Sequence, residues 1–142
     1  MKTKKSRSKY QPGNFKLKVK RATPGAGLGL YADQDLPKGV CIIEYFGRTL
    51  SLAEEYTSRS KYLFEINSKK TIDGGIRANT ARYINHSCRP NAEVEIIKGR
   101  VFIMAKRSIK AGKEIAYDYG KEYWNEHIKP LGCRCVKCSE KK

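Results

Sequence analysis

The sequence lacks the features that would place it in a membrane or in the secretory pathway. No apolar run approaches the roughly 18 residues that a transmembrane helix needs. The basic N-terminus, MKTKKSRSKY, does not lead into the apolar segment of a secretory signal peptide. We therefore expect an intracellular protein with no membrane contact. Its 142 residues suffice for one domain with a single core.

Acidic residues are scarce. Thirty lysines and arginines face 14 aspartates and glutamates, which gives a net charge of +16, and residues 1–21 carry nine of the basic residues and no acid. Such a tail can be a solvated, disordered segment that only aids solubility. It can equally attract a polyanion such as DNA, RNA or a nucleoprotein. The charge alone leaves both interpretations open.

The number of cysteines, five, is odd, and no four of them lie close enough in the sequence to form an obvious zinc site. An odd number in an intracellular chain argues against a disulfide framework. Cys133, Cys135 and Cys138 form the metal-like run CRCVKC, but three thiolates do not complete a tetrahedral zinc site. Cys41 lies in the apolar run VCII, which predicts a buried small hydrophobe. Cys88 lies among turn-forming residues and is the better candidate for a fourth ligand.

Two familiar enzyme classes are disfavoured by missing residues. GAGLGL resembles the dinucleotide-binding pattern Gly-x-Gly-x-x-Gly, but Leu30 stands where the last glycine is required and no βαβ unit follows. What remains is a glycine loop between two strands, either a tight turn or a place where backbone approaches a ligand closely. His86 and Cys88 could form a thiol nucleophile couple. A catalytic base usually comes from elsewhere in the fold, however, and the only other histidine is His127.

Helical periodicity is rare along the chain, whereas short β-rich runs and turn signals recur. Strands are predicted at residues 15–22, 40–46 and 62–66, in a hairpin at 93–105 that turns at Lys98-Gly99, and near the end of 109–120. Residues 72–75 are expected to form a turn. Short helical segments are predicted after Ser51, where Ser51 and Glu54 have capping-box spacing, at 76–87 and at 120–129. These patterns indicate a mostly β domain and no βαβ sheet.

Tyrosines are numerous and clustered. Tyr117 and Tyr119 are two residues apart in EIAYDYG, so they share one face of a strand. In isolation such a pair usually indicates two core residues. Tyr45, Tyr62 and Tyr83 lie in similar short clusters, however, and a pocket lined by phenols can hold a cation by ring faces and hydroxyls.

Four segments together carry a family resemblance. In this order and at these separations, GAGLGLYA, IIEYFG, ARYINHSCRPN and EIAYDYG resemble SET-domain protein lysine methyltransferases, and CRCVKC is similar to that family's post-SET zinc segment. The resemblance implies a mostly β SET-domain fold of several short sheets and a few short helices. Its C-terminal segment would thread under the loop around RYINHSC in a knot-like manner. The implied organisation is a basic flexible tail at 1–14, a SET domain at 15–120 and a post-SET-like segment at 121–142.

The resemblance also implies a reaction, the transfer of a methyl group from S-adenosylmethionine to a lysine of a basic protein. The cofactor pocket would be formed by Ala26, Gly27, Leu28, Tyr62, Arg82, Asn85 and His86. The lysine channel would be lined by the catalytic tyrosines Tyr45, Tyr117 and Tyr119. A dry channel and the sulfonium charge both favour the neutral amine that attacks, so Tyr119 would position the amine and would not act as a base. A tyrosine at position 117, where the family has Phe or Tyr, implies mainly mono-methylation, with some di-methylation.

Metal and partner expectations follow from the same resemblance. One structural zinc ion would join Cys88 to Cys133, Cys135 and Cys138, although the spacing here is C-x-C-x2-C and the family usually has C-x-C-x4-C. The substrate class would be a histone or histone-like protein, met in the nucleus on eukaryotic chromatin or at the cytoplasmic nucleoid in a bacterium. The basic tail would contact nucleic acid non-specifically.

A net charge of +16 opposes a basic substrate unless acidic residues receive it locally. Glu44, Glu93 and Glu95 are the candidates for such an acidic patch. The alternative function is a non-catalytic, zinc-containing module that binds nucleic acid or chromatin. The charge favours this alternative. The phenolic cluster, the glycine loop and the NHS run do not, because phosphate binding needs none of them.

Overall fold

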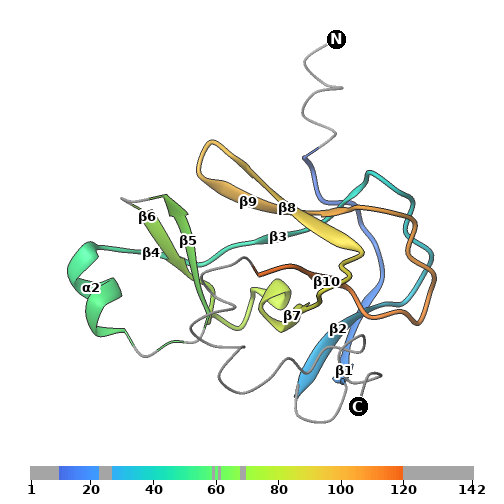
Figure 1. Cartoon of the computed structure of the whole chain (residues 1–142), viewed down its shortest axis with the longest axis horizontal. Coiled ribbons are helices and arrows are strands. Elements are labelled where there is room, and N and C mark those ends of the chain that lie inside the picture. Colours follow the sequence, from blue (N-terminus) through green and yellow to red (C-terminus); the bar gives the residue numbers. More distant parts are fainter. Residues whose placement is uncertain (1–9, 23–26, 59, 61, 68–69, 120–142) are drawn as a thin grey trace. The chain divides into compact units, whose positions relative to one another are not determined.

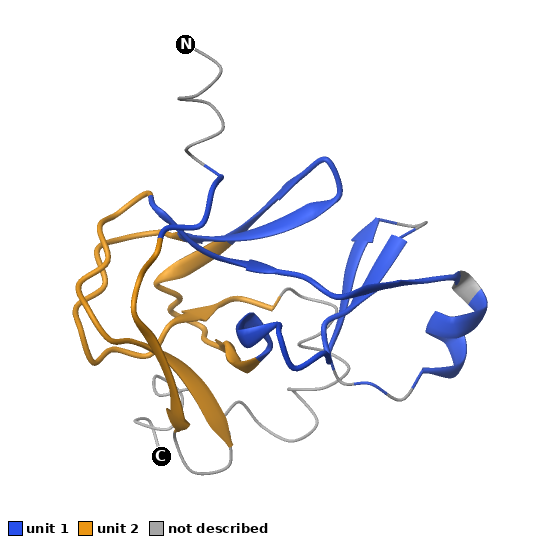
Figure 2. Ribbon diagram, turned by 180° about the vertical axis from the view of Figure 1, so that it is seen from behind, with its two compact units in different colours: residues 1–13, 40–82, 94–104 blue, residues 14–39, 83–93, 105–142 orange. Residues whose placement is uncertain are grey.

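Short strands dominate the computed structural model of the chain (Figure 1). The structure describes residues 10–22, 27–58, 60, 62–67 and 70–119. Two compact units are distinguished in Figure 2, and the chain passes between them several times. Unit 1 contains residues 1–13, 40–82 and 94–104, and unit 2 contains residues 14–39, 83–93 and 105–142. None of the described helices is long and apolar enough to cross a membrane.

Unit 1 contains most of two three-stranded sheets. The first has the order β3 (Cys41–Tyr45), β9 (Arg100–Ala105), β8 (Ala92–Ile97), and the second has the order β4 (Arg48–Leu50), β6 (Lys70–Asp73), β5 (Leu63–Asn67). In the second sheet β6 runs antiparallel to both neighbours. Ile42, Ile72, Val101 and Ile103 are buried in this unit. Cys41 is buried as well, which confirms its prediction as a small hydrophobe; burial, and secondly Glu44, raises the pKa of its thiol to about 11.

Local signals predicted two features of unit 1 in detail. The hairpin between β8 and β9 turns at Lys98 and Gly99, which both have positive φ, as a two-residue type I′ turn requires. Helix α2 (Leu52–Thr57) begins with the predicted capping box. The Glu54 N–H donates to Ser51 Oγ at 3.2 Å, and the Ser51 N–H donates to Glu54 Oε1 at 3.0 Å. The predicted turn at 72–75 is wrong in its first half, because residues 72 and 73 end strand β6.

Unit 2 contains two short strand pairs. β1 (Leu17–Arg21) is antiparallel to β2 (Leu28–Ala32), and β7 (Asn85–His86) is parallel to β10 (Ala116–Tyr117). The 3₁₀ helix η1 (Thr80–Tyr83) precedes β7 and confirms the irregular helical turn predicted there. The unit's core includes Leu30, Leu36, Ile109 and Ile115, all at most 2% exposed.

The prediction of a mostly β fold with a few short helices is confirmed. The pairing of β7 with β10 places the RYINHSC segment beside EIAYDYG, as the expected threading requires. The threading itself, the helix predicted at 120–129 and the post-SET-like segment depend on residues after 119, which lie outside the described part of the chain.

Candidate functional site

In unit 2, the predicted motifs ARYINHSCRPN and EIAYDYG are hydrogen-bonded to each other through strands β7 and β10, and we call this pair of strands the frame. Asn85 and Ala116 are register partners, as are His86 and Tyr117. Asn91 fixes the same frame from the side: its Nδ2 donates to the Glu114 carbonyl at 2.9 Å, and its Oδ1 accepts the Ala116 N–H at 3.0 Å. Although each strand has only two residues, the side-chain hydrogen bonds of Asn91 help to hold the two strands in position.

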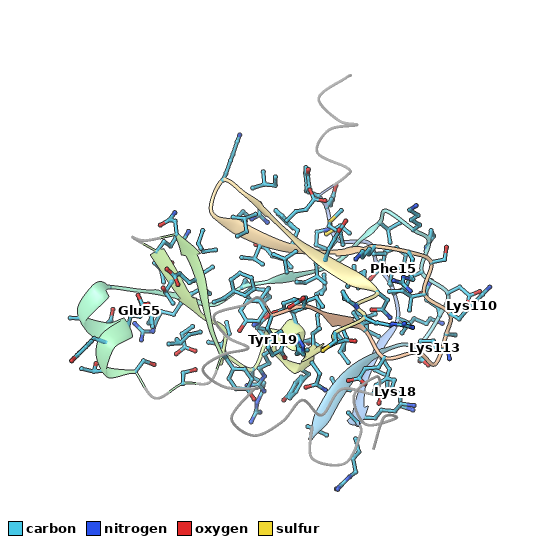
Figure 3. The ribbon with its side chains drawn as sticks, viewed as in Figure 1. Phe15, Lys18, Glu55, Lys110, Lys113 and Tyr119 are labelled. Atoms are coloured by element: carbon cyan, nitrogen blue, oxygen red, sulfur yellow. The ribbon has the colours of Figure 1, made fainter. Side chains whose placement is uncertain are left out.

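Tyr119, labelled in Figure 3, follows β10 and is held at both ends. Its hydroxyl donates to the Ile84 carbonyl at 2.5 Å, and its backbone N–H donates to His86 Nδ1 at 3.1 Å. Its ring centroid lies 5.2 Å from that of Tyr117, which is buried. Because the carbonyl accepts the hydroxyl proton, the phenolic oxygen presents lone pairs to any other neighbour. Such an oxygen suits the positioning of an amine better than proton abstraction.

His86 is a structural acceptor in this frame. Nδ1 accepts the Tyr119 N–H, so the ring proton of the neutral imidazole resides on Nε2, which lies 3.6 Å from Cys88 Sγ. Burial lowers the pKa of His86, and Asp118, whose carboxylate lies 3.8 Å from Nδ1, opposes this in part. A histidine that already carries its proton toward the thiol cannot remove the thiol's proton. The geometry therefore opposes the Cys-His hydrolase considered from the sequence.

Asn85 links the glycine loop to the segment that leads into β10. Its Nδ2 donates to the Leu28 carbonyl at 3.0 Å and to Glu114 Oε2 at 2.8 Å. Since both partners are acceptors, the amide orientation is fixed, and Oδ1 faces away from them. Gly29 leaves room for this carboxylate, because a Cβ at its position would lie 2.5 Å from Glu114 Oε2. Gly27 has a φ of +74°, so the loop uses its glycines both for positive φ and for close approach.

Three further predicted residues gather in unit 1 around the loop after β6. Tyr45 is buried, its hydroxyl donates to the Tyr62 carbonyl at 2.7 Å, and its ring fills the space that a Cβ at Gly74 would occupy. Arg82 donates from Nη1 to the Gly75 carbonyl at 3.3 Å, and its guanidinium lies 5.7 Å from the centroid of the Tyr62 ring. Tyr45 thus contacts the backbone of Tyr62, and Arg82 lies near its ring, within the same unit.

Several supporting residues were missed by the sequence reasoning. Asn79 is fully buried, donates to the Gly74 carbonyl at 2.9 Å and accepts the Phe46 N–H at 3.3 Å, so it ties two loops of unit 1 together. Glu114 and Asn91 have the corresponding role in unit 2. Asn79 lies two residues before ARYINHSCRPN and Glu114 is the first residue of EIAYDYG, so closeness to these motifs was the signal that could have identified them.

The structure thus brings the predicted residues together in two groups, each inside one unit. Unit 2 groups Gly27, Leu28, Asn85, His86, Tyr117 and Tyr119, and unit 1 groups Tyr45, Tyr62 and Arg82. Ala26 and the C-terminal Cys133, Cys135 and Cys138 lie outside the described residues. Within the described residues no group of three or more His, Cys, Asp or Glu side chains could hold a metal ion, and Cys88 is exposed.

The acidic patch suggested by the sequence is weakened by the contacts of its members. Arg100 donates to both carboxylate oxygens of Glu44, at 3.0 and 2.8 Å. Glu95 accepts the Tyr10 hydroxyl at 2.9 Å. Both carboxylates are therefore already engaged by side chains of this chain.

Comparison with known proteins gives consistent matches. The SET domain family model matches residues 27–120. "Histone-lysine N-methyltransferase trr" of Drosophila melanogaster is 37% identical over 125 residues, which cover 79% of this chain and 5% of that protein. This chain thus spans only a small part of the length of that relative. Among solved structures, KRYPTONITE in complex with mCHH DNA, H3(1-15) peptide and SAH has a TM-score of 0.74 at 28% identity, covering 94% of this chain and 30% of that one. An autoinhibited ctPRC2 bound to S-adenosylmethionine has a TM-score of 0.69 at 27% identity, covering 76% and 15%.

Proposed function

The chain belongs to the SET-domain family, and from this premise we propose that it is an S-adenosylmethionine-dependent protein-lysine N-methyltransferase. The predicted family and the predicted SET-domain fold are both confirmed by the match over residues 27–120 and by the structural likeness. The relative is named a histone-lysine N-methyltransferase, and the solved structures are described as holding S-adenosylmethionine or SAH. These descriptions support the same reaction here.

The observation that carries the proposal is the anchoring of Tyr119. In the proposed reaction, the lone pair of a neutral lysine amine forms a bond to the methyl carbon of S-adenosylmethionine, the carbon–sulfur bond breaks, and the amine later releases a proton to water. The Tyr119 oxygen, with its own proton held by the Ile84 carbonyl, would accept a hydrogen bond from the amine and orient it. Orientation of this kind lowers a barrier by several kcal/mol without any acid or base.

We propose that the cofactor is bound by the residues predicted from the sequence, and the contacts in unit 2 support this proposal best. Gly27 and Leu28 would offer backbone, and Asn85 and His86 would act as fixed elements of the wall. The engaged N–H groups of Asn85 leave Oδ1 as the group it can direct at a ligand. Ala26, Tyr62 and Arg82 are retained as proposed contributors on the strength of the family resemblance.

Product specificity is assigned to Tyr117. Its ring is buried and lies against Tyr119, so its hydroxyl would occupy space beside the amine. We propose that this limits the enzyme mainly to mono-methylation, with some di-methylation. Tyr45 would line the same lysine channel, as the family resemblance implies.

Zinc is proposed on the chemistry of the donor set. Cys88 is exposed at the corner after β7, and its thiolate would join those of Cys133, Cys135 and Cys138 in a tetrahedral site. Such a site would fix the C-terminal segment and would not take part in methyl transfer.

The proposed substrate is a histone or a histone-like basic protein, because the relatives act on histones by name and KRYPTONITE was solved with an H3(1-15) peptide. Its setting would be nuclear for eukaryotic chromatin or the nucleoid for a bacterial one, and the basic tail would add non-specific contact with nucleic acid. The non-catalytic binding module remains the competing proposal.

Transfer of labelled methyl groups from S-adenosylmethionine onto purified histones tests the proposal, with mass spectrometry to map the sites. We expect transfer by the wild-type chain and near-complete loss in Tyr119→Phe, with SAH binding by calorimetry retained in that variant. A chain that binds duplex DNA but binds neither S-adenosylmethionine nor SAH would instead be the non-catalytic module.

A further inference from the structure

The positive charge of the described residues is concentrated in one unit. In unit 1 they comprise six basic and six acidic side chains, so the formal charges cancel. In unit 2 they comprise ten basic and five acidic side chains. General solubility does not require this separation, because it depends on the net charge of the whole chain. A local excess of positive charge does attract a polyanion.

The excess in unit 2 includes a surface that we call the basic edge, formed by Lys16, Lys18, Lys20 and Arg21. β1 pairs only with β2 in the described structure, and every residue of β1 after Leu17 is exposed. Lys16, Lys18 and Lys20 alternate along the extended chain and so project from one side of it. They span about 13 Å, which is close to the axial rise of about four base pairs of DNA.

Further lysines lie beyond the other edge of β2. The Lys113 carbonyl accepts the Ala32 N–H at 2.9 Å, whereas the register partner of Ala32 on β1 is Leu17. Lys113 therefore extends the basic surface across β2, and Lys18, Lys110 and Lys113 are labelled together in Figure 3. One or two lysines on an edge strand are explained by the need to prevent pairing with another chain. That need does not explain cationic residues on both sides of β2.

The acids of unit 2 do not neutralise this edge. Glu114 accepts from Asn85 at 2.8 Å, and Asp35 accepts the Ala111 N–H at 2.9 Å and lies 3.7 Å from Lys110. Across the described residues, no ion pair includes a lysine of the basic edge.

Two contacts single out the middle of the edge. Asp33, whose N–H donates to the Lys16 carbonyl at 2.9 Å, places an exposed carboxylate near its start. The Lys20 ammonium lies 4.4 Å from the centroid of the Tyr31 ring, a cation–π contact that orients the charge without cancelling it. Lys18 and Lys20 are therefore the positions of the basic edge whose positive charge is least neutralised by nearby acids.

We propose that the basic edge binds the phosphate backbone of duplex DNA, independently of base sequence. Lysine side chains act as point charges and suit phosphates without reading bases. Single-stranded nucleic acid is disfavoured, because its binding sites combine positive charge with exposed aromatic rings on which bases stack. The large hydrophobics exposed in the described part of unit 2 are Val19 and Leu28, and neither is aromatic. An enzyme docked in this way would meet a basic protein substrate already bound to DNA.

Fluorescence anisotropy with a labelled duplex, measured over a series of salt concentrations, tests the assignment on the full chain. Lys18→Ala/Lys20→Ala should weaken binding and reduce the slope of log K against log salt by about 2, at about 0.9 for each lost phosphate contact. The matched control is Arg48→Ala/Arg77→Ala, which removes the same charge from exposed positions of unit 1. Its slope should stay near that of the wild type.

Three results would overturn the proposal. One is an equal loss of duplex affinity in the two double variants, which would mean that the net charge or the N-terminal tail is responsible for binding. Another is tighter binding of single-stranded RNA than of the duplex, and the third is displacement of the duplex by polyglutamate at matched charge. Tyr119→Phe should bind DNA like the wild type, so failure of the proposed methyl transfer and failure of this surface are distinguishable.

Discussion

Replacing Gly29 by alanine tests whether Glu114 holds Asn85 in the orientation that the proposed cofactor site needs. The new methyl carbon would lie 2.5 Å from Glu114 Oε2, about 1 Å inside ordinary contact, and 3.1 Å from Asn85 Nδ2. The carboxylate is the end of a flexible side chain, so it should swing away and break its 2.8 Å bond to Asn85. Asn85 would then be held only through the Leu28 carbonyl.

The size of the effect follows from that single bond. A hydrogen bond to a charged group contributes about 1.5–3 kcal/mol, and partial exposure of Glu114 favours the lower end. A loss of about 1.4 kcal/mol corresponds to about tenfold in a dissociation constant. We therefore expect SAH to bind about tenfold more weakly to Gly29→Ala, and to Glu114→Ala by the same amount. Glu114→Gln should restore most of the affinity, because its amide oxygen can accept from Asn85.

Isothermal titration calorimetry with SAH is the assay, and thermal unfolding checks that each variant is folded. The double variant Gly29→Ala/Glu114→Ala should lose no more than either single variant, because both break the same bond. Glu93→Ala, which removes an exposed carboxylate from the same unit, is the matched control and should bind SAH like the wild type. Additive losses, or a Glu114→Gln variant as weak as Glu114→Ala, would refute the reasoning. Because SAH binding is read directly, the outcome does not depend on methyl transfer.

Three further predictions concern single side chains. Tyr117→Phe should shift products toward di- and tri-methyl lysine in mass spectra, and a wild-type enzyme that yields mainly trimethyl product under excess cofactor would contradict the role assigned to this hydroxyl. Elemental analysis should find one zinc per chain, lost in Cys88→Ser but kept in Cys41→Ser; wild-type protein without zinc would exclude the metal site. Asn79→Ala should lower the free energy of unfolding by about 2–6 kcal/mol in urea titration, since each of its two backbone partners would lose its bond at about 1–3 kcal/mol; a loss below about 1 kcal/mol would mean that water replaces the amide.

Much of the fold could be predicted because its signals are local. The capping box at Ser51 and Glu54 and the hairpin turn at Lys98-Gly99 are set by residues within a few positions of one another. β4 and β6 were missed because three or four residues are too few to show a periodicity. β7 and β10 have only two residues each, and their parallel pairing depends on partners about 30 positions apart in the chain.

The site divides in a similar way. Tyr45, Tyr117 and Tyr119 could be proposed as site residues because their motifs are distinctive. Asn79 and Glu114 were not, because their importance arises from burial and from partners that only the folded chain supplies. The role of Gly29 likewise depends on the approach of Glu114, a contact that only the folded chain supplies. The sequence left open whether the glycine loop is a tight turn or a place of close approach, whereas the structure shows that Gly29 accommodates the Glu114 carboxylate.

The net charge of +16 conflicts with a basic substrate only if the charge acts uniformly. Exposed charges are screened within about 8 Å at physiological ionic strength. Tyr119 contacts the Ile84 carbonyl, the ring of His86 and the phenol of Tyr117. The Asp118 carboxylate lies 3.8 Å from His86 Nδ1, and none of these groups is cationic. An amine that reaches Tyr119 would therefore meet lone pairs, while the exposed lysines of β1 would act on a polyanion outside. It follows that added salt should weaken duplex binding strongly while changing the KM for a short histone peptide little. A KM that fell steeply with salt would show instead that the lysines repel the substrate.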